Sequence, residues 1–394
     1  MEVTVIFPLR EAGVAYRPGE TFETKPSRGW RLAELGLVKA PPIQSYDYRT
    51  EWTELRQIIG ARPEGIIQFK TRRSRLDQLR PGETLLLIRK YGGLGDILIQ
   101  SMMLPDLRNQ FPEVAVTYAP PRKYHALFEG SGITLRAYEE VFAETGVHHR
   151  GGVRADLLDE YDLIEDLSIP CHVWENLFAM YGGVDGGHGL KWRNRLDMWS
   201  RWIGLTPRHP RTCITIRPEE REAARRRLNA RSTKPPLIFA PLAANVTKSY
   251  PWMPEVIAGL SEDWTVFTMH DRSLPPDLGR TLTGLTIRQM GAACAEAAQI
   301  VAVDTSVFHW GGILGRPTLG LFNVNDGAAY ARYYPTVRIM QCCDTPCLNT
   351  KYRTCGKLVS GKLPVIPGLG HTLSRCYQPD TVGRILEALR HDTA

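Results

Sequence analysis

The 394-residue sequence contains no apolar run of about 18 residues, the minimum for a membrane-spanning helix. Residues 1–13 also lack the apolar core and the small-residue cleavage site of a secretory signal peptide. These absences predict no membrane span and favour a cytoplasmic protein. Composition excludes little else, because 43% hydrophobic and 23% charged residues are ordinary for a globular chain.

Complete phosphate-binding fingerprints are absent as well. Residues 89–100, RKYGGLGDILIQ, lie between an apolar run and a predicted helix, where a phosphate-binding turn would be expected. However, Gly93-Leu-Gly95 lacks the third glycine of G-x-G-x-x-G, and no G-K-[ST] follows. Asp96 at a helix start would also repel a phosphate. The segment is therefore neither a dinucleotide fingerprint nor a Walker loop.

Two roles remain open for Asp96. Its carboxylate can cap the following helix by accepting hydrogen bonds from the first-turn amides. Alternatively, it can be a general base that faces a cleft between domains. The local sequence favours the cap, because capping aspartates are common and catalytic ones are rare.

The sequence has a formal net charge of +7 and a pI near 9.0, which favours anionic partners such as nucleic acid, anionic lipid or a phosphorylated small molecule. Its densest basic run, residues 219–231, also contains glutamates. We therefore expect this run to form an exposed helix with internal charge compensation.

Four segments lie outside the central part of the chain. Residues 1–45 predict a small β-rich module, similar to modules of bacteriophage proteins, and residues 46–82 predict a linker. Residues 342–377 are rich in cysteine, and residues 378–394 predict a helix.

The central part alternates apolar strand patterns with helix patterns over residues 83–228 and again over residues 229–341. This alternation predicts an α/β protein with two facing, doubly wound parallel-sheet domains. In the first domain, residues 96–111 predict one continuous helix. Domains of this kind bind ligands at the carboxyl ends of their strands.

Three stretches together resemble glycosyltransferase family 9, the lipopolysaccharide heptosyltransferases of the GT-B fold. They are IRKYGGLGDILIQSMMLPDLRNQFPEVAVTYA, PLAANVTKSYPWMPEVIAGL and IVAVDTSVFHWGGILGRPTLGLFNVND, and the resemblance covers about residues 84–345. It implies two Rossmann-like domains, the first for the acceptor and the second for a nucleotide sugar.

The resemblance also implies roles for individual residues. Asp96 matches the aspartate of the family's Gly-Asp motif, its proposed general base, and Lys248 matches the lysine that contacts the donor diphosphate. The D-[ST]-x-x-x-H motif places five further residues at the donor site: Asp304, Thr305, Ser306, Val307 and His309. Three of these residues have a plain structural alternative: Lys248 as a surface lysine, His309 as a packed histidine, and Asp304 as a helix cap.

On the acceptor side, Gly93 and Gly95 are expected to clear space beside Asp96. His188, in the glycine-rich residues 181–189, either faces the acceptor or belongs to a mobile loop. Three positions depart from the family pattern: Ser306 in place of glycine, Trp310-Gly311 in place of a small pair, and Asn323-Val-Asn325 in place of Gly-Pro-Thr. The last two departures leave the identity of the donor open.

The implied reaction is inverting transfer of a heptose or hexose from a nucleotide-diphosphate sugar, similar to ADP-heptose, to a hydroxyl of a protein or saccharide. Two alternatives stay open. One is a phage-borne glycosyltransferase that modifies hydroxymethylated bases of DNA, which the basic pI would suit. The other is a GT-B protein that binds without catalysis.

Five of the eight cysteines lie between residues 342 and 376. Without a secretion signal, this cluster favours a metal site over a disulfide framework. Cys343, Cys347, Cys355 and Cys376 would supply four thiolates for structural zinc or iron, with Cys342 as a substitute for Cys343. The alternative is a set of thiols without a metal.

The layout is similar to the autotransporter heptosyltransferase branch of the family, which has an N-terminal extension and a four-cysteine iron segment. Because those relatives form large assemblies, the resemblance implies a homo-oligomer. It also implies that the C-terminal helix crosses back to the first domain, as is common in GT-B enzymes.

Overall fold

The computed structural model describes strand segments between residues 2 and 39 and most of the chain from residue 72 onward. The described ranges after the strand segments are 72–73, 76–89, 93–141, 153–167, 194–229, 232–244, 248–270, 279–343 and 376–390. The chain divides into two units. The smaller comprises Met1–Ile66, Val173–Lys191 and Cys347–Lys351, and the larger contains the remainder.

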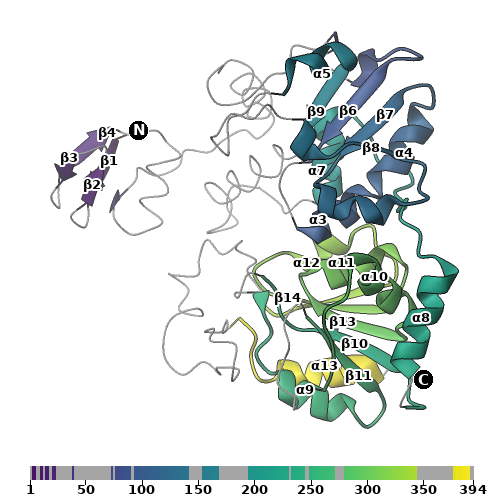
Figure 1. Ribbon diagram of the computed structural model, residues 1–394. Coiled ribbons are helices and arrows are strands. Elements are labelled where there is room, and N and C mark those ends of the chain that lie inside the picture. Colours follow the sequence, from purple (N-terminus) through teal and green to yellow (C-terminus); the bar gives the residue numbers. More distant parts are fainter. Residues whose placement is uncertain are drawn as a thin grey trace. The chain divides into compact units, whose positions relative to one another are not determined.

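The described part of the smaller unit is β-rich, as predicted. A three-stranded antiparallel sheet has the order β4-β1-β5, and a separate hairpin pairs β2 with β3 (Figure 1). The bounds are β1 Glu2–Val5, β2 Leu9–Glu11, β3 Val14–Tyr16, β4 Thr21–Glu23 and β5 Val38–Lys39. The pattern of residues 27–42 predicts a short helix; most of this segment lies outside the described residues, and Val38–Lys39 form strand β5 instead.

The first half of the larger unit contains a parallel sheet of four strands in the order β8-β7-β6-β9. Its central strand β6 is apolar throughout its buried part, as expected for a strand covered on both faces. The strands are β6 Thr84–Ile88, β7 Ala115–Ala119, β8 Thr134–Leu135 and β9 Leu163–Asp166. The helices are η1 Leu76–Gln78, α3 Leu94–Gln100, α4 Met103–Gln110, η2 Arg122–Phe128, η3 Tyr138–Glu140, α5 Ala155–Glu160 and α7 Arg195–Ile203.

The second half contains a parallel sheet of six strands in the order β12-β11-β10-β13-β14-β15. Numbered within this half, that order is 3-2-1-4-5-6, the Rossmann order, whose ligand site lies where the order reverses. The strands are β10 Pro236–Ala240, β11 Thr265–Met269, β12 Arg280–Leu282, β13 Gln299–Val303, β14 Thr318–Phe322 and β15 Val337–Gln341. The helices are α8 Pro218–Asn229, α9 Met253–Leu260, α10 Ile287–Glu296, α11 Ser306–Ile313, α12 Gly327–Ala331 and α13 Thr381–Arg390.

The single helix predicted over residues 96–111 is wrong, because the segment forms two helices, α3 and α4. Pro105 has no backbone N–H and cannot donate to the carbonyl of Ser101 four residues earlier. That carbonyl instead accepts a hydrogen bond from the backbone N–H of Cys213 at 3.1 Å. The proline therefore interrupts the helix and anchors the segment that leads to α8.

Helix α13 packs against α9, and Gly259 of α9 permits the close approach (Figure 1). A Cβ on Gly259 would lie 2.5 Å from the Leu386 side chain. Ile385 and Leu389 of α13 belong to the core cluster of the six-stranded half. The expectation that this helix crosses back to the first domain is therefore wrong for its described residues.

The basic run predicted to be an exposed helix forms α8, and three of its arginines pair with glutamates. Arg221 and Arg225 pair with Glu296 of α10 at 2.6 and 3.0 Å, and Arg226 pairs with Glu222 at 3.4 Å. Helix α8 lies beside α10 (Figure 1), and the ion pairs with Glu296 connect the two helices.

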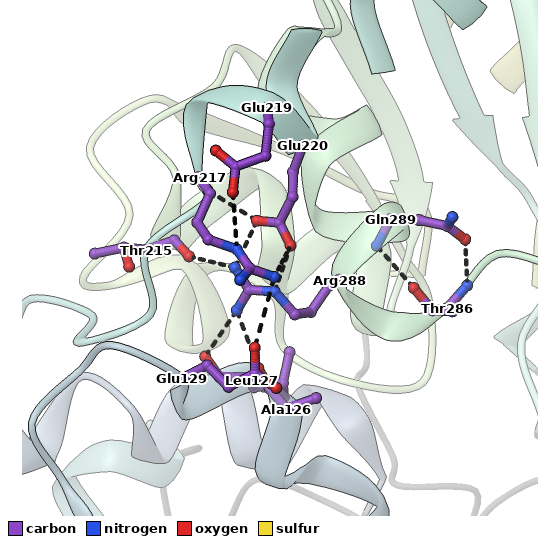
Figure 2. Close-up of polar contacts among 10 residues, drawn as sticks. All are labelled: Ala126, Leu127, Glu129, Thr215, Arg217, Glu219, Glu220, Thr286, Arg288 and Gln289. Atoms are coloured by element: carbon purple, nitrogen blue, oxygen red, sulfur yellow. Dashed lines mark hydrogen bonds and ion pairs between the residues drawn. The ribbon is translucent and has the colours of Figure 1, made fainter. Parts of the chain in front are cut away.

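One buried arginine connects both halves of the larger unit (Figure 2). Arg288 of α10 is 6% exposed and donates two hydrogen bonds of 2.5 Å to the carboxylate of Glu220 in α8. The same guanidinium donates to the carbonyls of Ala126 and Leu127 in η2 at 3.0 and 3.4 Å, and to that of Thr215 at 3.0 Å. It satisfies three backbone acceptors and one carboxylate at once.

Candidate active site

The structure places Asp96 inside a helix instead of at its cap. Gly93 is the N-cap of α3, and no side-chain cap hydrogen bond is present there. Asp96 is the third helical residue, and it is 7% exposed. The cap interpretation is therefore wrong, and the burial of this carboxylate requires another explanation.

Two arginines compensate the buried carboxylate. Arg89, directly after β6, donates to Asp96 Oδ2 at 3.0 Å, and Arg195 at the start of α7 donates to Oδ1. Burial by itself raises the pKa of Asp96. The attraction of Arg195 and Arg89 outweighs burial, so the pKa lies below the ordinary value and the group is ionised at neutral pH.

Arg89 is itself held firmly. Its guanidinium donates to the carbonyl of Leu167 at 2.8 Å and lies 5.1 Å from the ring centroid of Trp199. Leu167 follows β9, which neighbours β6 where the strand order of the first sheet reverses. Asp96 and its arginines therefore lie at the switch point of this sheet.

A second buried carboxylate lies at the switch point of the other sheet. Asp304 follows β13, and its Oδ2 accepts from Lys248 Nζ at 2.7 Å and from the side-chain amide of Asn325. Lys248 belongs to the connection between β10 and α9. Burial raises the pKa of Asp304, but Lys248 and the other nearby positive charges bring it down to about 2.

His309 of α11 lies near both carboxylates. It is 4% exposed, and its Nδ1 lies 3.0 Å from the Tyr334 hydroxyl, while Nε2 lies 3.9 Å from Asp304 Oδ1. Burial lowers the pKa of His309 to about 4 against the opposing effect of Asp304 and Asp96. The imidazole is therefore neutral at pH 7.

Gly95 of α3 allows His309 to come close. A Cβ on Gly95 would lie 2.7 Å from His309 Cδ2, whereas a Cβ on Gly93 would meet no atom of the described residues within 4 Å. The two predicted glycines therefore differ: Gly95 is needed for the packing of α3 against α11, and Gly93 leaves open space.

The remaining donor-side residues form the first turn of α11. Thr305 is the N-cap without a side-chain cap hydrogen bond, and its buried Oγ1 has no hydrogen-bond partner. Ser306 contacts Met290 through its hydroxyl at 3.8 Å, and Val307 is buried. The backbone amides of such a turn are suited to bind an anion.

Among the departures from the family pattern, Trp310 and Gly311 serve packing. Trp310 is fully buried against Gly291, where a Cβ would lie 2.8 Å from the indole, and a Cβ on Gly311 would lie 2.2 Å from Thr318 Oγ1. Asn325, in contrast, contacts Asp304, and its buried Oδ1 has no partner.

Several predicted site residues lie outside the described part of the chain. His188, Cys347 and Cys355 are among them, whereas Cys343 and Cys376 are described and buried. The described residues contain no group of three or more His, Cys, Asp or Glu side chains that could hold a metal. The four-cysteine metal site therefore stays a prediction.

Sequence reasoning missed Arg195 and Tyr334. Arg195 lies 99 residues after Asp96 and in no motif, and Tyr334 lies 25 residues after His309. The only local signal was the amphipathic pattern that begins at residue 195, which predicts a helix but not a contact with Asp96.

No family model and no curated protein sequence matches this chain. Among solved structures, a glycosyltransferase family 9 protein from Veillonella parvula matches with 15% identity and a TM-score of 0.53, covering 79% of this chain and 99% of its own. The ADP-heptose lipopolysaccharide heptosyltransferase II of E. coli matches with 12% identity and a TM-score of 0.50, covering 78% and 97%.

A third match is TibC of enterotoxigenic E. coli, an iron-containing dodecameric glycosyltransferase. It has 13% identity and a TM-score of 0.52, and the alignment covers 79% of this chain and 77% of TibC. These similarities confirm the predicted fold: the chain has the GT-B architecture of family 9 glycosyltransferases, with two parallel-sheet α/β halves. Within the described residues, no helix is long and apolar enough to cross a membrane.

Proposed function

We propose that this protein is an inverting glycosyltransferase that uses a nucleotide-diphosphate sugar, with Asp96 as general base. One observation carries the proposal. Each sheet has a buried, ionised carboxylate at its switch point, Asp96 in the first half and Asp304 in the second, and His309 lies close to both. Helix caps and surface ion pairs do not require this arrangement.

On the donor side, Lys248 and the first-turn amides of α11 would bind the diphosphate. Lys248 is paired with Asp304 in the free protein, so diphosphate binding exchanges one anionic partner for another. We favour an ADP-linked heptose as the donor. The name of heptosyltransferase II includes ADP-heptose, and a structure of TibC contains ADP-D-beta-D-heptose.

In the proposed reaction, an acceptor oxygen forms a bond to the anomeric carbon of the sugar while its proton passes to Asp96. The bond from that carbon to the diphosphate oxygen breaks on the opposite face, which inverts the configuration. The electron pair leaves with the nucleoside diphosphate, and Lys248 and the α11 amides stabilise the growing charge. Aimed donors of this kind are usually the largest catalytic contribution.

For the acceptor we retain a hydroxyl of a protein or saccharide. The pairing of Arg221, Arg225 and Arg226 with glutamates leaves the densest basic run largely compensated. That compensation weakens the case for DNA as the acceptor, since non-specific DNA binding depends on cations that are available to phosphates.

Substitution Asp96→Asn tests the assignment of the base. We expect the variant to remain folded and to lose transfer by about 10²–10⁴-fold, because the amide cannot take the acceptor proton. The measurement is release of nucleoside diphosphate from a panel of nucleotide sugars that includes ADP-heptose, with protein, saccharide and DNA acceptors. Transfer by Asp96→Asn at the wild-type rate would contradict the role of Asp96.

A further inference from the structure

The start of α7 is joined to α12 by polar contacts that connect the two halves of the larger unit. Asn194 donates from Nδ2 to the carbonyls of Ala329 and Tyr330 at 2.9 and 3.2 Å. Asp197 of α7 pairs with Arg332 at 2.7 Å. We refer to these residues together with Arg195 as the α7–α12 contact.

Within this contact, Arg195 reaches both Asp96 of the first half and Tyr330 of the second half. Its guanidinium donates to the Asp96 carboxylate, and its Cζ lies 5.7 Å from the ring centroid of Tyr330 in α12. A guanidinium on the face of an aromatic ring is stabilised by cation–π attraction. Arg195 is thus held from the second half while it compensates a carboxylate of the first.

Tyr330 is also linked to the donor side. Its ring is 5% exposed and lies 6.1 Å from the His309 ring and 5.8 Å from the Phe322 ring, between centroids. Helix α12 begins after Asp326, directly behind Asn325, whose amide donates to Asp304. A change at Asp304 therefore has a short path to the ring that holds Arg195: a hydrogen bond to Asn325 and then the chain from Asn325 into α12.

The charged and titratable groups that face Asp96 come from four elements. They are Arg89 after β6, Arg195 of α7, His309 of α11 and Tyr118 of β7. His309 is neutral at pH 7 because burial lowers its pKa to about 4, and burial raises the pKa of Tyr118 so that it is neutral as well. Arg89 is held by Leu167 and Trp199 of the first half. Arg195 is the cation whose support comes from the second half.

We propose that Arg195 and Tyr330 are positioning residues that couple the donor side to Asp96: Tyr330 holds the guanidinium of Arg195 against the carboxylate, and movement of α12 changes that contact. The importance of this coupling for catalysis rests on the proposed function. The coupling itself is a property of the free protein and can be measured without a reaction.

The test is a pH titration of the Asp96 carboxyl carbon by NMR, in full-length protein labelled with ¹³C at the aspartate γ position. Asp96→Asn assigns the signal, and circular dichroism confirms the fold at each pH. Tyr330→Leu removes the ring face, and Tyr330→Phe is the matched control that keeps it. We expect the Asp96 midpoint to rise in Tyr330→Leu and to stay at the wild-type value in Tyr330→Phe.

Arg195→Gln is a second test, which applies also if Tyr330→Leu does not fold. Arg195→Gln removes the cation directly and is expected to raise the midpoint further in the same direction. ADP, used as the probe of the donor side, is expected to move the Asp96 signal in the wild type and in Tyr330→Phe. Calorimetry first establishes that ADP binds; an unchanged Asp96 signal in wild type that is saturated with ADP would then overturn the coupling, whereas absence of ADP binding counts against the proposed donor alone.

The two proposals fail in different ways. If Tyr330→Leu folds and Asp96 titrates as in the wild type, the coupling is overturned, whatever the enzyme assays give. If Asp96→Asn retains transfer while Tyr330→Leu shifts the Asp96 midpoint, the coupling stands and the general-base assignment is overturned.

Discussion

At the scale of single residues, the buried carboxylates explain which cations the site needs. An ionised carboxylate away from water is tolerated only with close positive partners or hydrogen-bond donors. Asp96 has Arg89 and Arg195, and Asp304 has Lys248 and Asn325. Removal of one of these partners therefore leaves a buried carboxylate with less compensation. For Lys248 it would also remove the proposed contact with the donor diphosphate.

Lys248→Met tests the proposed contact between Lys248 and the donor diphosphate. A charge-assisted hydrogen bond contributes about 1.5–3 kcal/mol, so we expect the affinity for ADP to fall about 10- to 100-fold, at about 1.4 kcal/mol per tenfold change. Titration calorimetry with ADP measures this. Lys234→Met is the matched control, because Lys234 is exposed and donates to the carbonyl of Ser261. Equal ADP affinities of the two variants would contradict the donor role of Lys248.

The sequence could predict some of these residues and not others, for a physical reason. Lys248, Asp304 and His309 lie beside strand ends, where the chain order itself brings ligand-binding groups to one edge of a sheet. Arg195 reaches Asp96 only through the packing of α7 on α3, and nothing near either residue in the sequence encodes that contact. The local sequence also predicted Asp96 as a helix cap, but the helix begins at Leu94, so that Gly93 is the N-cap and Asp96 lies within the first turn.

At the scale of elements, the approach of α3 to α11 depends on one glycine. Gly95→Ala would place a methyl group 2.7 Å from the His309 ring, and the methyl group of Gly93→Ala would meet no atom within 4 Å in the part of the chain that the structure describes. Overpacking of this kind costs about 1–3 kcal/mol. We expect Gly95→Ala to lower the free energy of unfolding by that amount and to disturb activity. Gly93→Ala should cost less, about 0.5 kcal/mol, because alanine is a poorer N-cap than glycine.

Urea unfolding of the two alanine variants measures this difference, with the same protein concentration and buffer. Alanine has a higher helix propensity than glycine, so helix propensity alone would stabilise Gly95→Ala. A measured loss of stability would therefore come from the contact with His309. Equal stabilities of Gly95→Ala and Gly93→Ala would contradict the close approach of His309.

The same scale shows why strand and helix patterns were largely predictable. Strands β6, β10, β13 and β14 are buried parallel strands, and their continuous apolar runs are a strong signal. Strand β12 has three residues and helix α12 has five, too few for a period to emerge. The break between α3 and α4 was missed because the apolar pattern continues through Pro105.

At the scale of the whole larger unit, Arg288 makes stability depend on an ion pair with Glu220. The hydrogen bonds from Arg288 lower the pKa of Glu220 from an ordinary 4.5 to about 2, against the effect of burial. Because the folded-state pKa is the lower one, the stabilisation is complete above pH 4.5 and is lost as the pH falls toward 2.

Arg288→Met tests this connection. We expect a loss of about 3–5 kcal/mol at pH 7, because one carboxylate and three carbonyls lose their shared donor. Arg226→Met, which removes an exposed ion pair with Glu222, is the control and should cost about 0–1 kcal/mol. The difference in unfolding free energy between wild type and Arg288→Met should shrink as the pH is lowered below 4.5, to the part that the three carbonyl hydrogen bonds supply. A difference that stays constant down to the acid limit of the fold would contradict the role of the ion pair.

The partner exchange at Lys248 has a consequence for the kinetics of encounter. Three cations, Arg89, Arg195 and Lys248, already face two carboxylates, so the free site presents a net charge of only about one unit to the solvent. In the proposed function, these local charges steer an approaching diphosphate only weakly, and Lys248 has to leave Asp304 before it can bind the diphosphate. Such a site would select among anions after contact more than it would speed their arrival.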